Sequence, residues 1–323
     1  MSIRLSSRER KMEWSDRIGR RIKLRDLHIL LAVAECGSMA KAAKHLAISQ
    51  PVVSRVIADL EQVFGVRLMD RDRHGAELTI YGDALLKRGV AAFDELRSGV
   101  AEIDFLSDPT VGELRIGAME VIAAGFVAAV IDRISRRHPR IAFEVRTDGT
   151  TELDRELRDR NIDLIIGRVP GRIVDEKVDV ETLFDEPTYV AAGMRNPLVR
   201  RRRRITLADL VDELWILPSR ENVARSLITE AFHASGLQIP QRVVVANSMQ
   251  MLNTLVSTGR FLALHSASYL RFSAGLVVKI LPVEMPLLST PVGIVTLKNR
   301  TLNPITKLFI EYAHTVARPL TKG

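Results

Sequence analysis

The sequence contains 323 residues, of which 46% are hydrophobic and 27% charged, and its formal net charge is +8 at pH 7. This length allows two or three domains with substantial cores, and the composition is that of an ordinary globular protein. No apolar run reaches the ~18 residues that a membrane-spanning helix needs, and the first residues do not resemble a signal peptide. The one cysteine, Cys36, excludes an internal disulfide framework, so we expect a cytoplasmic protein with no membrane partner.

The positive charge is concentrated in two places, the first 82 residues and the run from Arg200 to Arg204. An excess of Lys and Arg indicates a polyanionic partner. We interpret the arginine run as a solvated loop, and residues 1–22, which are polar and lack periodicity, as a loose basic extension. The basic N-terminal region is therefore the first candidate for a nucleic-acid interface.

Residues 23–82 have the pattern of three short helices followed by a hairpin. The first helix has one apolar face, and Gly37 ends it. Ser38 is a good N-cap for a second helix and Ser49 for a third, in which Pro51 occupies the first turn. The short connection between the second and third helices predicts a helix-turn-helix.

The third helix has two contrasting faces. One narrow arc is apolar and is expected in the core; it holds Val53, Ile57, Leu60 and Phe64. The opposite arc is small or polar; it holds Pro51, Ser54, Arg55 and Ala58. Gln50, Ser54 and Arg55 carry hydrogen-bonding groups for base edges, and Pro51 suits a thymine methyl. The alternative is an ordinary solvated face, which usually carries more Lys and Glu.

The segment RLMDRDRHGAELT, residues 67–79, predicts a hairpin wing with Gly75 in its turn. Arg71 and Arg73 lie near the tip, where arginines suit phosphates or a narrow minor groove. The alternative is a loop whose charges only keep it soluble.

Residues 83–108 predict one long helix that ends before Pro109. Its apolar residues repeat in two seams like those of a short coiled coil: Leu86, Phe93, Val100, Leu96 and Ile103. This pattern predicts a dimerisation helix. Packing on its own N-terminal domain is the alternative, and the two are compatible.

From residue 111 to 317, short apolar runs alternate with helical stretches. Continuous apolar strands between helices indicate an α/β fold with parallel sheets covered on both faces. No P-loop, GxGxxG, GxSxG or HExxH motif is present, so we expect no enzyme, and we assign no catalytic or metal-binding residue.

The segment SMAKAAKHLAISQPVVSRVIADLEQVFGVRLMDR, residues 38–71, followed by LT at 78 and Gly82, resembles the winged helix-turn-helix of LysR-type transcriptional regulators. The resemblance implies a winged helix-turn-helix over residues 23–82, a linker helix over 83–108 and an effector-binding domain over 111–317. By resemblance this last domain has two subdomains like those of periplasmic binding proteins, subdomain I (111–185 and 288–317) and subdomain II (186–287), with chain crossings near 186 and 288. Tyr81-Gly82 and DLIIGRV at 163–169 are similar to the subgroup that controls protocatechuate and galactose-uptake operons.

The resemblance also implies partners: double-stranded promoter DNA, RNA polymerase, a small-molecule effector and further copies of the chain in a homodimer or homotetramer. No other cofactor is expected. By the same resemblance, the residues that contact bases are Gln50, Pro51, Ser54 and Arg55, and Ser38 contacts a phosphate. The alternatives are a solute-binding protein of a transporter and a metabolic enzyme with an added DNA-binding domain; the missing signal peptide and residues 1–82 argue against the first, and the missing catalytic motifs against the second.

In this family the effector lies between the subdomains, against helix N-termini and strand ends. Helix N-termini favour anions through their free N–H groups and the helix dipole. The matching positions here are Glu120, Val121, Thr150, Thr151, Arg168, Ser219, Asn222, Asn247 and Ser248. Glu120 departs from the usual Ser, Thr or Pro, and its carboxylate would satisfy a helix N-terminus and repel an anionic ligand. Arg168 can bind a carboxylate through two hydrogen bonds, and Arg168 and Glu120 are candidates for an ion pair with each other. Helix capping or plain surface polarity is the alternative for each position.

Overall fold

The computed structural model describes residues 21–72, 75–169, 175–201, 203–220, 222–273, 275, 277–284 and 288–321. Residues 1–20 of the expected basic extension, and Arg73, lie outside this part. The chain divides within one helix into a unit that ends at Arg97 and a unit that begins at Ser98. No helix in the described residues is long and apolar enough to cross a membrane.

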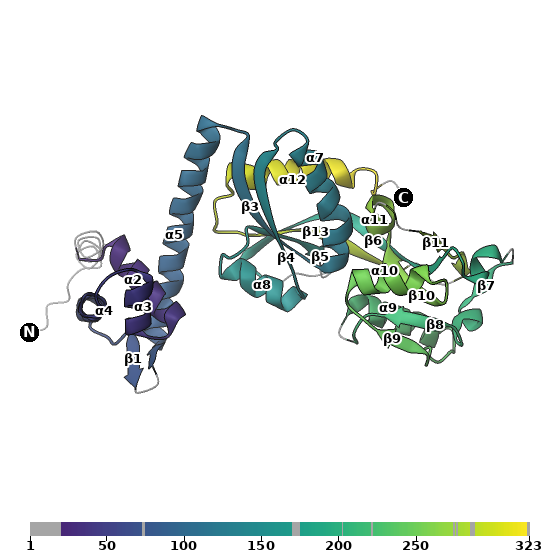
Figure 1. Cartoon of the computed structure of the whole chain (residues 1–323), viewed down its shortest axis with the longest axis horizontal. Helices are drawn as coiled ribbons and strands as arrows, with labels where there is room; N and C mark the ends of the chain where they lie inside the picture. Colours follow the sequence, from purple (N-terminus) through teal and green to yellow (C-terminus); the bar gives the residue numbers. More distant parts are fainter. Residues whose placement is uncertain are drawn as a thin grey trace, which may run out of the picture. The chain divides into compact units, whose positions relative to one another are not determined.

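The N-terminal unit is a winged helix-turn-helix (Figure 1). Its elements are α2 (Leu24–Cys36), α3 (Met39–His45), α4 (Gln50–Phe64), β1 (Met69–Asp72), β2 (Gly75–Leu78) and the first part of α5 (Ile80–Ser107). Gly37 and Gly65 end α2 and α4 with φ values of 62° and 71°, which glycine adopts without strain. The carbonyl of Gly37 accepts a 3.0 Å hydrogen bond from the amide of Ala76, so the wing is tied to the helix-turn-helix.

Helix α5 packs on this unit with one face. A Cβ at Gly82 would overlap the carbonyl oxygen of Leu68, and Gly89 lies against Leu27. Leu86 packs on the core of the unit. Phe93 contacts the ring of His28 with centroids 6.1 Å apart. The first half of the expected dimerisation seam therefore contacts its own domain.

The second unit contains one mixed sheet in the order β4-β3-β5-β13-β6-β10-β8-β9, with β11 beside β6. The strands of this unit are β3 (Val111–Ala118), β4 (Arg140–Thr147), β5 (Leu164–Arg168), β6 (Val178–Gly193), β7 (Ile205–Thr206), β8 (Leu214–Leu217), β9 (Val243–Val245), β10 (Phe261–Ser266), β11 (Val278–Ile280), β12 (Val283–Glu284) and β13 (Leu288–Leu297). Strands β3, β4 and β5 are parallel, as are β8, β9 and β10. The expectation of parallel sheets throughout is wrong at β6 and β13, which run antiparallel to their neighbours.

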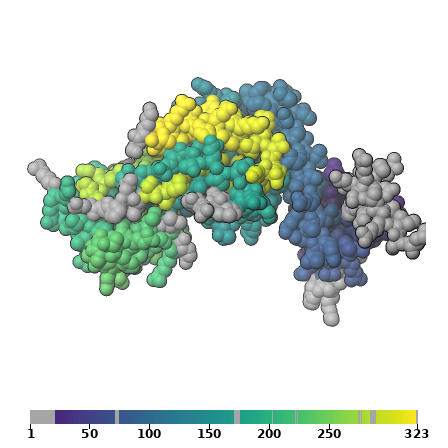
Figure 2. All heavy atoms as spheres, turned by 180° about the vertical axis from the view of Figure 1, so that it is seen from behind, coloured from purple at the N-terminus to yellow at the C-terminus, as the bar shows by residue number. Residues whose placement is uncertain are grey.

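Helices cover both parts of the sheet. They are α6 (Glu120–Ile122), the π-helical turn η1 (Ala123–Val127), α7 (Ala128–Ser135), α8 (Thr150–Arg158), the 3-10 turns η2 (Pro197–Arg200) and η3 (Leu207–Leu210), α9 (Val223–Ala234), α10 (Met249–Ser257), α11 (Ala267–Phe272) and α12 (Pro304–Ala317). The C-terminal α12 packs beside α7 over β3 and is seen from outside in Figure 2. Separate hydrophobic cores form around β3, β5 and β13 and around β8 and β10.

Strand β6 joins the two cores. Its residues up to Thr188 pair with β13, and its residues from Thr188 onward pair with β10. We call the part built on β3, β4 and β5 subdomain I, and the part built on β8, β9 and β10 subdomain II. Because β6 and β13 pass between them side by side, the boundary between the subdomains is a pair of antiparallel strands.

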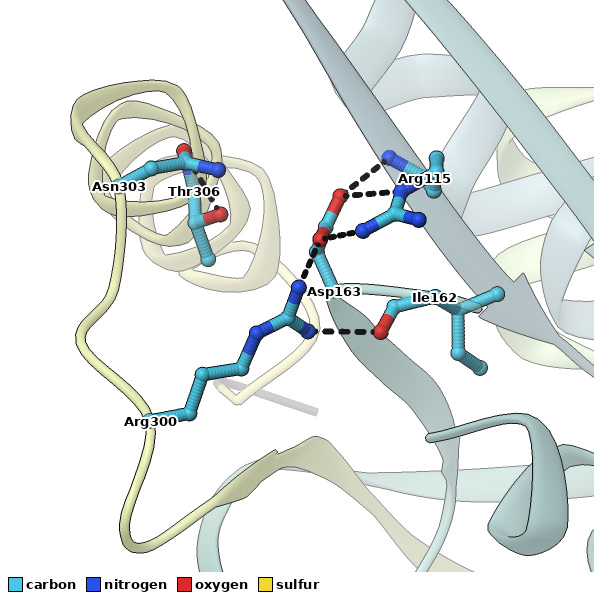
Figure 3. A network of polar contacts seen from close by, with 6 residues as sticks. All are labelled: Arg115, Ile162, Asp163, Arg300, Asn303 and Thr306. Atoms are coloured by element: carbon cyan, nitrogen blue, oxygen red, sulfur yellow. Dashed lines mark hydrogen bonds and ion pairs between the residues drawn. The ribbon is translucent and has the colours of Figure 1, made fainter. Parts of the chain in front are cut away.

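A buried ionic network stiffens subdomain I (Figure 3). The carboxylate of Asp163, at the start of β5, accepts hydrogen bonds from the Arg115 amide at 2.8 Å and from the Arg115 Nη2 at 2.7 Å. Arg300, which follows β13, donates to the same carboxylate at 2.6 Å and to the Ile162 carbonyl at 2.7 Å. The network therefore fixes β3, β5 and the segment after β13 to one another.

Candidate functional sites

Helix α4 presents the predicted base-reading residues at its N-terminal end. Val53, Ile57 and Leu60 are buried, as the helix pattern predicts. Gln50, Pro51 and Arg55 are exposed. The Arg55 side chain, 85% exposed, lies 4.0 Å from Asp59, an acidic residue that the sequence reading did not consider. Such a loose surface pair leaves Arg55 free to turn to DNA.

The three serines predicted at this site differ from Arg55. Ser54 is half-buried, and its hydroxyl donates to Met39 Sδ at 3.4 Å. Ser38 and Ser49 stand at the N-cap positions of α3 and α4, but neither side chain makes a capping hydrogen bond. The hydroxyls of Ser38 and Ser49 are therefore not committed to their helices, whereas that of Ser54 is directed to the core.

The wing is a two-stranded hairpin in which Asp72 pairs with Gly75. Arg71 lies in β1, but its side chain is outside the described part of the structure, as is the whole of Arg73. Of the run from Arg200 to Arg204, Arg201 pairs with Asp209 at 2.8 Å, and Arg203 lies 3.4 Å from the same carboxylate. This run is thus partly tied down rather than a wholly solvated loop.

The second half of the α5 seam is exposed. Leu96, Val100 and Ile103 are 51%, 58% and 64% exposed, and they fall on one face of the helix at i, i+4 and i+7. This exposed stripe continues the face that packs on the N-terminal unit. Exposed apolar stripes of this kind occur at protein–protein interfaces, among other interaction surfaces.

The predicted effector residues follow the carboxyl ends of β3, β4, β5, β8 and β9. Three of them hold local structure. Asn222 caps α9 by accepting from the Ala224 amide at 2.9 Å, and Ser248 caps α10 by accepting from the Met251 amide at 3.3 Å. Asn247 accepts from the Ser219 amide at 3.0 Å. Asn222 and Ser248 are therefore helix-capping residues, which was the alternative to effector binding.

The remaining threonines lie at the start of α8. Gly149 is the N-cap, so Thr150 and Thr151 are the first two helical residues, and both are exposed. A surface hollow of about 350 Å³ lies on α10 and is lined by Ser248, Gln250, Met251, Thr254 and Leu255. Only Ser248 is common to this hollow and the predicted effector set.

Glu120 reaches from subdomain I to subdomain II. It begins α6, and its Oε1 accepts a 2.9 Å hydrogen bond from the amide of Met249, the first residue of α10. The neighbouring Val121 packs against the cores of both subdomains. A Cβ at Gly125 would lie 2.8 Å from Tyr269 Cα, so η1 of subdomain I and α11 of subdomain II are in close contact. The carboxylate thus satisfies a helix N-terminus, though of a helix in the other subdomain.

Arg168 and Glu120 do not pair, contrary to expectation. The charge that acts on Arg168 is that of Glu186, and burial lowers the pKa of the guanidinium. Its Nε and Nη1 are buried and have no hydrogen-bond partner among the described residues. Arg168 therefore keeps two unused donors in the interior.

Glu186, on the crossing strand β6, was missed by the sequence reading. It is fully buried and accepts hydrogen bonds from the amide and hydroxyl of Ser268 in α11, at 2.8 and 2.5 Å. Burial raises the pKa of this carboxyl group. Buried His265 lies on β10 opposite Tyr189 of β6; burial lowers its pKa to about 4, so the ring is neutral near pH 7. Its position inside the core indicates a structural residue.

Comparison with known proteins decides the family. The model of the bacterial regulatory helix-turn-helix protein, lysR family, matches residues 24–83, and that of the LysR substrate binding domain matches residues 107–318. The chain belongs to the LysR family of transcriptional regulators. The expected fold class and DNA-binding regulatory function are confirmed, and the helix-turn-helix match decides against a transporter's solute-binding protein.

Relatives span nearly the whole chain. The HTH-type transcriptional regulator GbpR of Azospirillum brasilense is 29% identical over 285 residues, which cover 88% of this chain and 83% of GbpR. A full-length OxyR variant from Pseudomonas aeruginosa has a TM-score of 0.64 at 22% identity and covers 93% of this chain and 96% of that chain. CbnR in complex with its target DNA has a TM-score of 0.61 at 22% identity, with 91% and 100% covered. At this identity the two structures show a common fold.

Proposed function

We propose that this LysR-type regulator binds promoter DNA as a homodimer or homotetramer in the cytoplasm and responds to a small metabolite held between its two subdomains. RNA polymerase is the expected partner at the promoter. The protein carries out no reaction of its own and uses no cofactor besides that metabolite. The observation that carries the regulatory part is the hydrogen bond between Glu120 and the amide of Met249.

This hydrogen bond links the subdomains at a place where a ligand can act. A carboxylate at a helix N-terminus typically contributes about 0.3–1 kcal/mol, and up to ~2 kcal/mol when partly buried. A metabolite that supplies its own hydrogen bonds can offset a loss of this size. Because a ligand shifts an equilibrium only by its differential affinity, one that needs Glu120 displaced favours the arrangement in which this contact is open. Our other candidates for effector binding are the predicted positions Thr150, Thr151 and Arg168 in subdomain I and Ser219 in subdomain II.

The DNA part of the proposal depends on α4 and the wing. Gln50, Pro51 and Arg55 are exposed on α4, where they can approach base edges. At the N-termini of α3 and α4, the hydroxyls of Ser38 and Ser49 make no capping hydrogen bond and can donate to phosphate oxygens. Dimerisation through Leu96, Val100 and Ile103 would bring two copies of α4 to the two halves of an operator.

Substitution of Glu120 tests the regulatory part. In a reporter strain carrying the promoter beside the protein's own gene, aromatic acids, sugar acids and neutral sugars are screened for a response. We expect Glu120→Ala to shift the concentration that gives half-maximal response at least threefold while operator affinity stays within twofold of wild type. Glu113→Ala, an exposed carboxylate on β3, is the matched control. Equal responses of wild type, Glu120→Ala and the control would show that the contact plays no part in regulation.

A further inference from the structure

The arginine run from Arg200 to Arg204 belongs to a longer segment that carries only positive charge. Residues 194–206 contain six arginines and no Asp or Glu. The segment includes η2 and β7, and Figure 1 shows β7 at the end of subdomain II that lies away from subdomain I. This surface therefore belongs neither to the boundary between the subdomains nor to the helix-turn-helix.

Two other parts of the chain bring further cations to this surface. Lys279 of β11 donates from Nζ to the Val199 carbonyl in η2 at 3.2 Å. A Cβ at Gly259 would lie 2.6 Å from the Cβ of Arg195, so the turn that carries Arg260 lies against the start of the segment. We call the exposed cations of this surface the basic end; they are Arg195, Arg200, Arg203, Arg204, Arg260 and Lys279.

One carboxylate fixes the arginine run in place. Asp209 in η3 accepts hydrogen bonds from the amide and the hydroxyl of Thr206, both at 3.0 Å, and from Arg201 at 2.8 Å. The bonds from Thr206 are the main cause that lowers the pKa of the Asp209 carboxyl group, so it is ionised near pH 7. Arg203 lies 3.4 Å from the same carboxylate, yet its side chain is 71% exposed. Asp209 thus anchors the run and leaves the Arg203 guanidinium accessible to a partner.

The chemistry of the basic end fits a polyphosphate better than another protein. Residues 194–217 carry six arginines and three carboxylates, which gives a net charge of +3. The centres of protein–protein interfaces are depleted in charged residues, whereas DNA phosphates are contacted in large part by Arg and Lys. A guanidinium can bind a phosphate through two parallel hydrogen bonds. DNA is also the polyanion that regulators of this family bind.

We propose that the basic end binds phosphates of double-stranded DNA, so that subdomain II adds a second DNA contact to that of the helix-turn-helix. This contact goes beyond the proposed function, which places the DNA contacts on α4 and the wing. Phosphate contacts carry no sequence information. The basic end should therefore raise the affinity for any DNA, while the choice of operator stays with α4.

The salt dependence of DNA binding by the full chain tests the proposal. Dissociation constants are measured by fluorescence anisotropy over a series of sodium chloride concentrations. The two DNAs are a duplex from the promoter beside the protein's own gene and a random duplex of the same length. Three variants are compared with wild type. The Gln variant replaces Arg195, Arg200 and Arg203 by Gln, the Lys variant replaces the same residues by Lys, and the control replaces the exposed Arg155, Arg271 and Arg318 of the same unit by Gln.

We expect the Gln variant to reduce the slope of log K against log[salt] by about 2–3, because each phosphate contact contributes about 0.9. At low salt it should bind both duplexes more weakly, on the order of tenfold and by the same factor for each. The control and the Lys variant, which keeps the charge, should stay within twofold of wild type. If the Gln variant melts at a lower temperature than wild type, Arg203→Gln alone replaces it, with an expected reduction of the slope of about 1.

Three outcomes would overturn the proposal. Equal slopes for wild type and the Gln variant would show that the basic end makes no contact with DNA. An equal loss of affinity in the Gln variant and the control would show that only the net charge of the protein matters. If the Gln variant binds both duplexes like wild type but no longer stimulates transcription by purified RNA polymerase, the basic end contacts an acidic protein surface instead of DNA.

Discussion

Replacement of Asp163 by Asn should destabilise the unit that spans Ser98–Gly323 more than any surface change. Asp163 is 5% exposed and is the shared acceptor of two arginines. Arg115 and Arg300 side chains are 15% and 5% exposed, so both guanidinium groups stay buried when the carboxylate is gone. The Asn amide nitrogen, a donor, would also face at least one of these donors.

The magnitude follows from burial. Breaking a buried ion pair by removing one partner costs about 3–5 kcal/mol, because the other charge stays in the interior without its counter-charge. For a unit of this size each kcal/mol lowers the Tm by roughly 2–4 °C, so Asp163→Asn should lower it by roughly 6–20 °C. Asp132→Asn is the matched control, since it breaks a pair with Arg136 whose side chains are 63% and 74% exposed. Exposed i,i+4 pairs contribute only about 0.3–0.5 kcal/mol.

Differential scanning calorimetry of both variants measures the effect, because the N-terminal unit can give a separate transition that serves as an internal reference. We also expect the Asp163→Asn variant to lose the effector response, since β3 and β5 carry Glu120 and Arg168 at their carboxyl ends. A decrease in Tm of less than 2 °C, or one equal to that of Asp132→Asn, would refute the view that this network holds subdomain I together.

The other predictions concern DNA binding, assembly and pH. Arg55→Ala should weaken operator binding by about 1–3 kcal/mol and random-duplex binding much less, in gel shifts at fixed salt, whereas Asp59→Ala should not weaken it. Leu96→Glu should prevent the proposed dimer from forming, as measured by analytical ultracentrifugation, and should leave the Tm of both units unchanged, because the side chain is exposed in the single chain. A variant that is still dimeric at micromolar concentration would contradict this. His265→Gln should flatten the pH dependence of the free energy of unfolding between about pH 4 and 6.5. In the wild type the native ring, whose pKa is lowered to about 4, stays neutral in this range, whereas the ring of the unfolded chain binds a proton. Wild-type stability therefore falls as the pH falls through this range. Gly82→Ala should destabilise the N-terminal unit by about 1–3 kcal/mol in urea titrations, because the methyl group meets a backbone carbonyl.

The N-terminal unit could be predicted from sequence because its signals are local. Gly37 and Gly65 are needed where φ is positive, and helix periodicity identifies the buried arc of α4. The sheet of the second unit was predicted less well. An apolar run has the same appearance whether its neighbours are parallel or antiparallel, so the directions of β6 and β13 were not available from their residues.

The contacts between the subdomains were the least predictable part, because they join residues far apart in the chain. Glu120 and Met249 are separated by 129 positions, and Glu186 and Ser268 by 82. A local pattern indicates that Glu120 suits a helix N-terminus, but not which helix. For the same reason Arg225 resembles any arginine in the first turn of a helix, and only the structure shows that its guanidinium is buried.

If the effector binds between the subdomains as proposed, the charges of Glu120 and Arg168 restrict its chemistry. Glu120 supplies a carboxylate to α10, whereas Arg168 retains two buried donors that no described residue satisfies. A purely apolar or cationic metabolite would leave those donors unpaired, at the cost that buried polar groups carry. A metabolite with an anionic end and hydroxyl groups would satisfy Arg168 and could also donate to Glu120, in competition with the Met249 amide. Binding such a molecule would satisfy the hydrogen bonds of the buried donors and weaken the contact between the subdomains. A ligand-controlled regulator needs this kind of coupling between ligand binding and conformation.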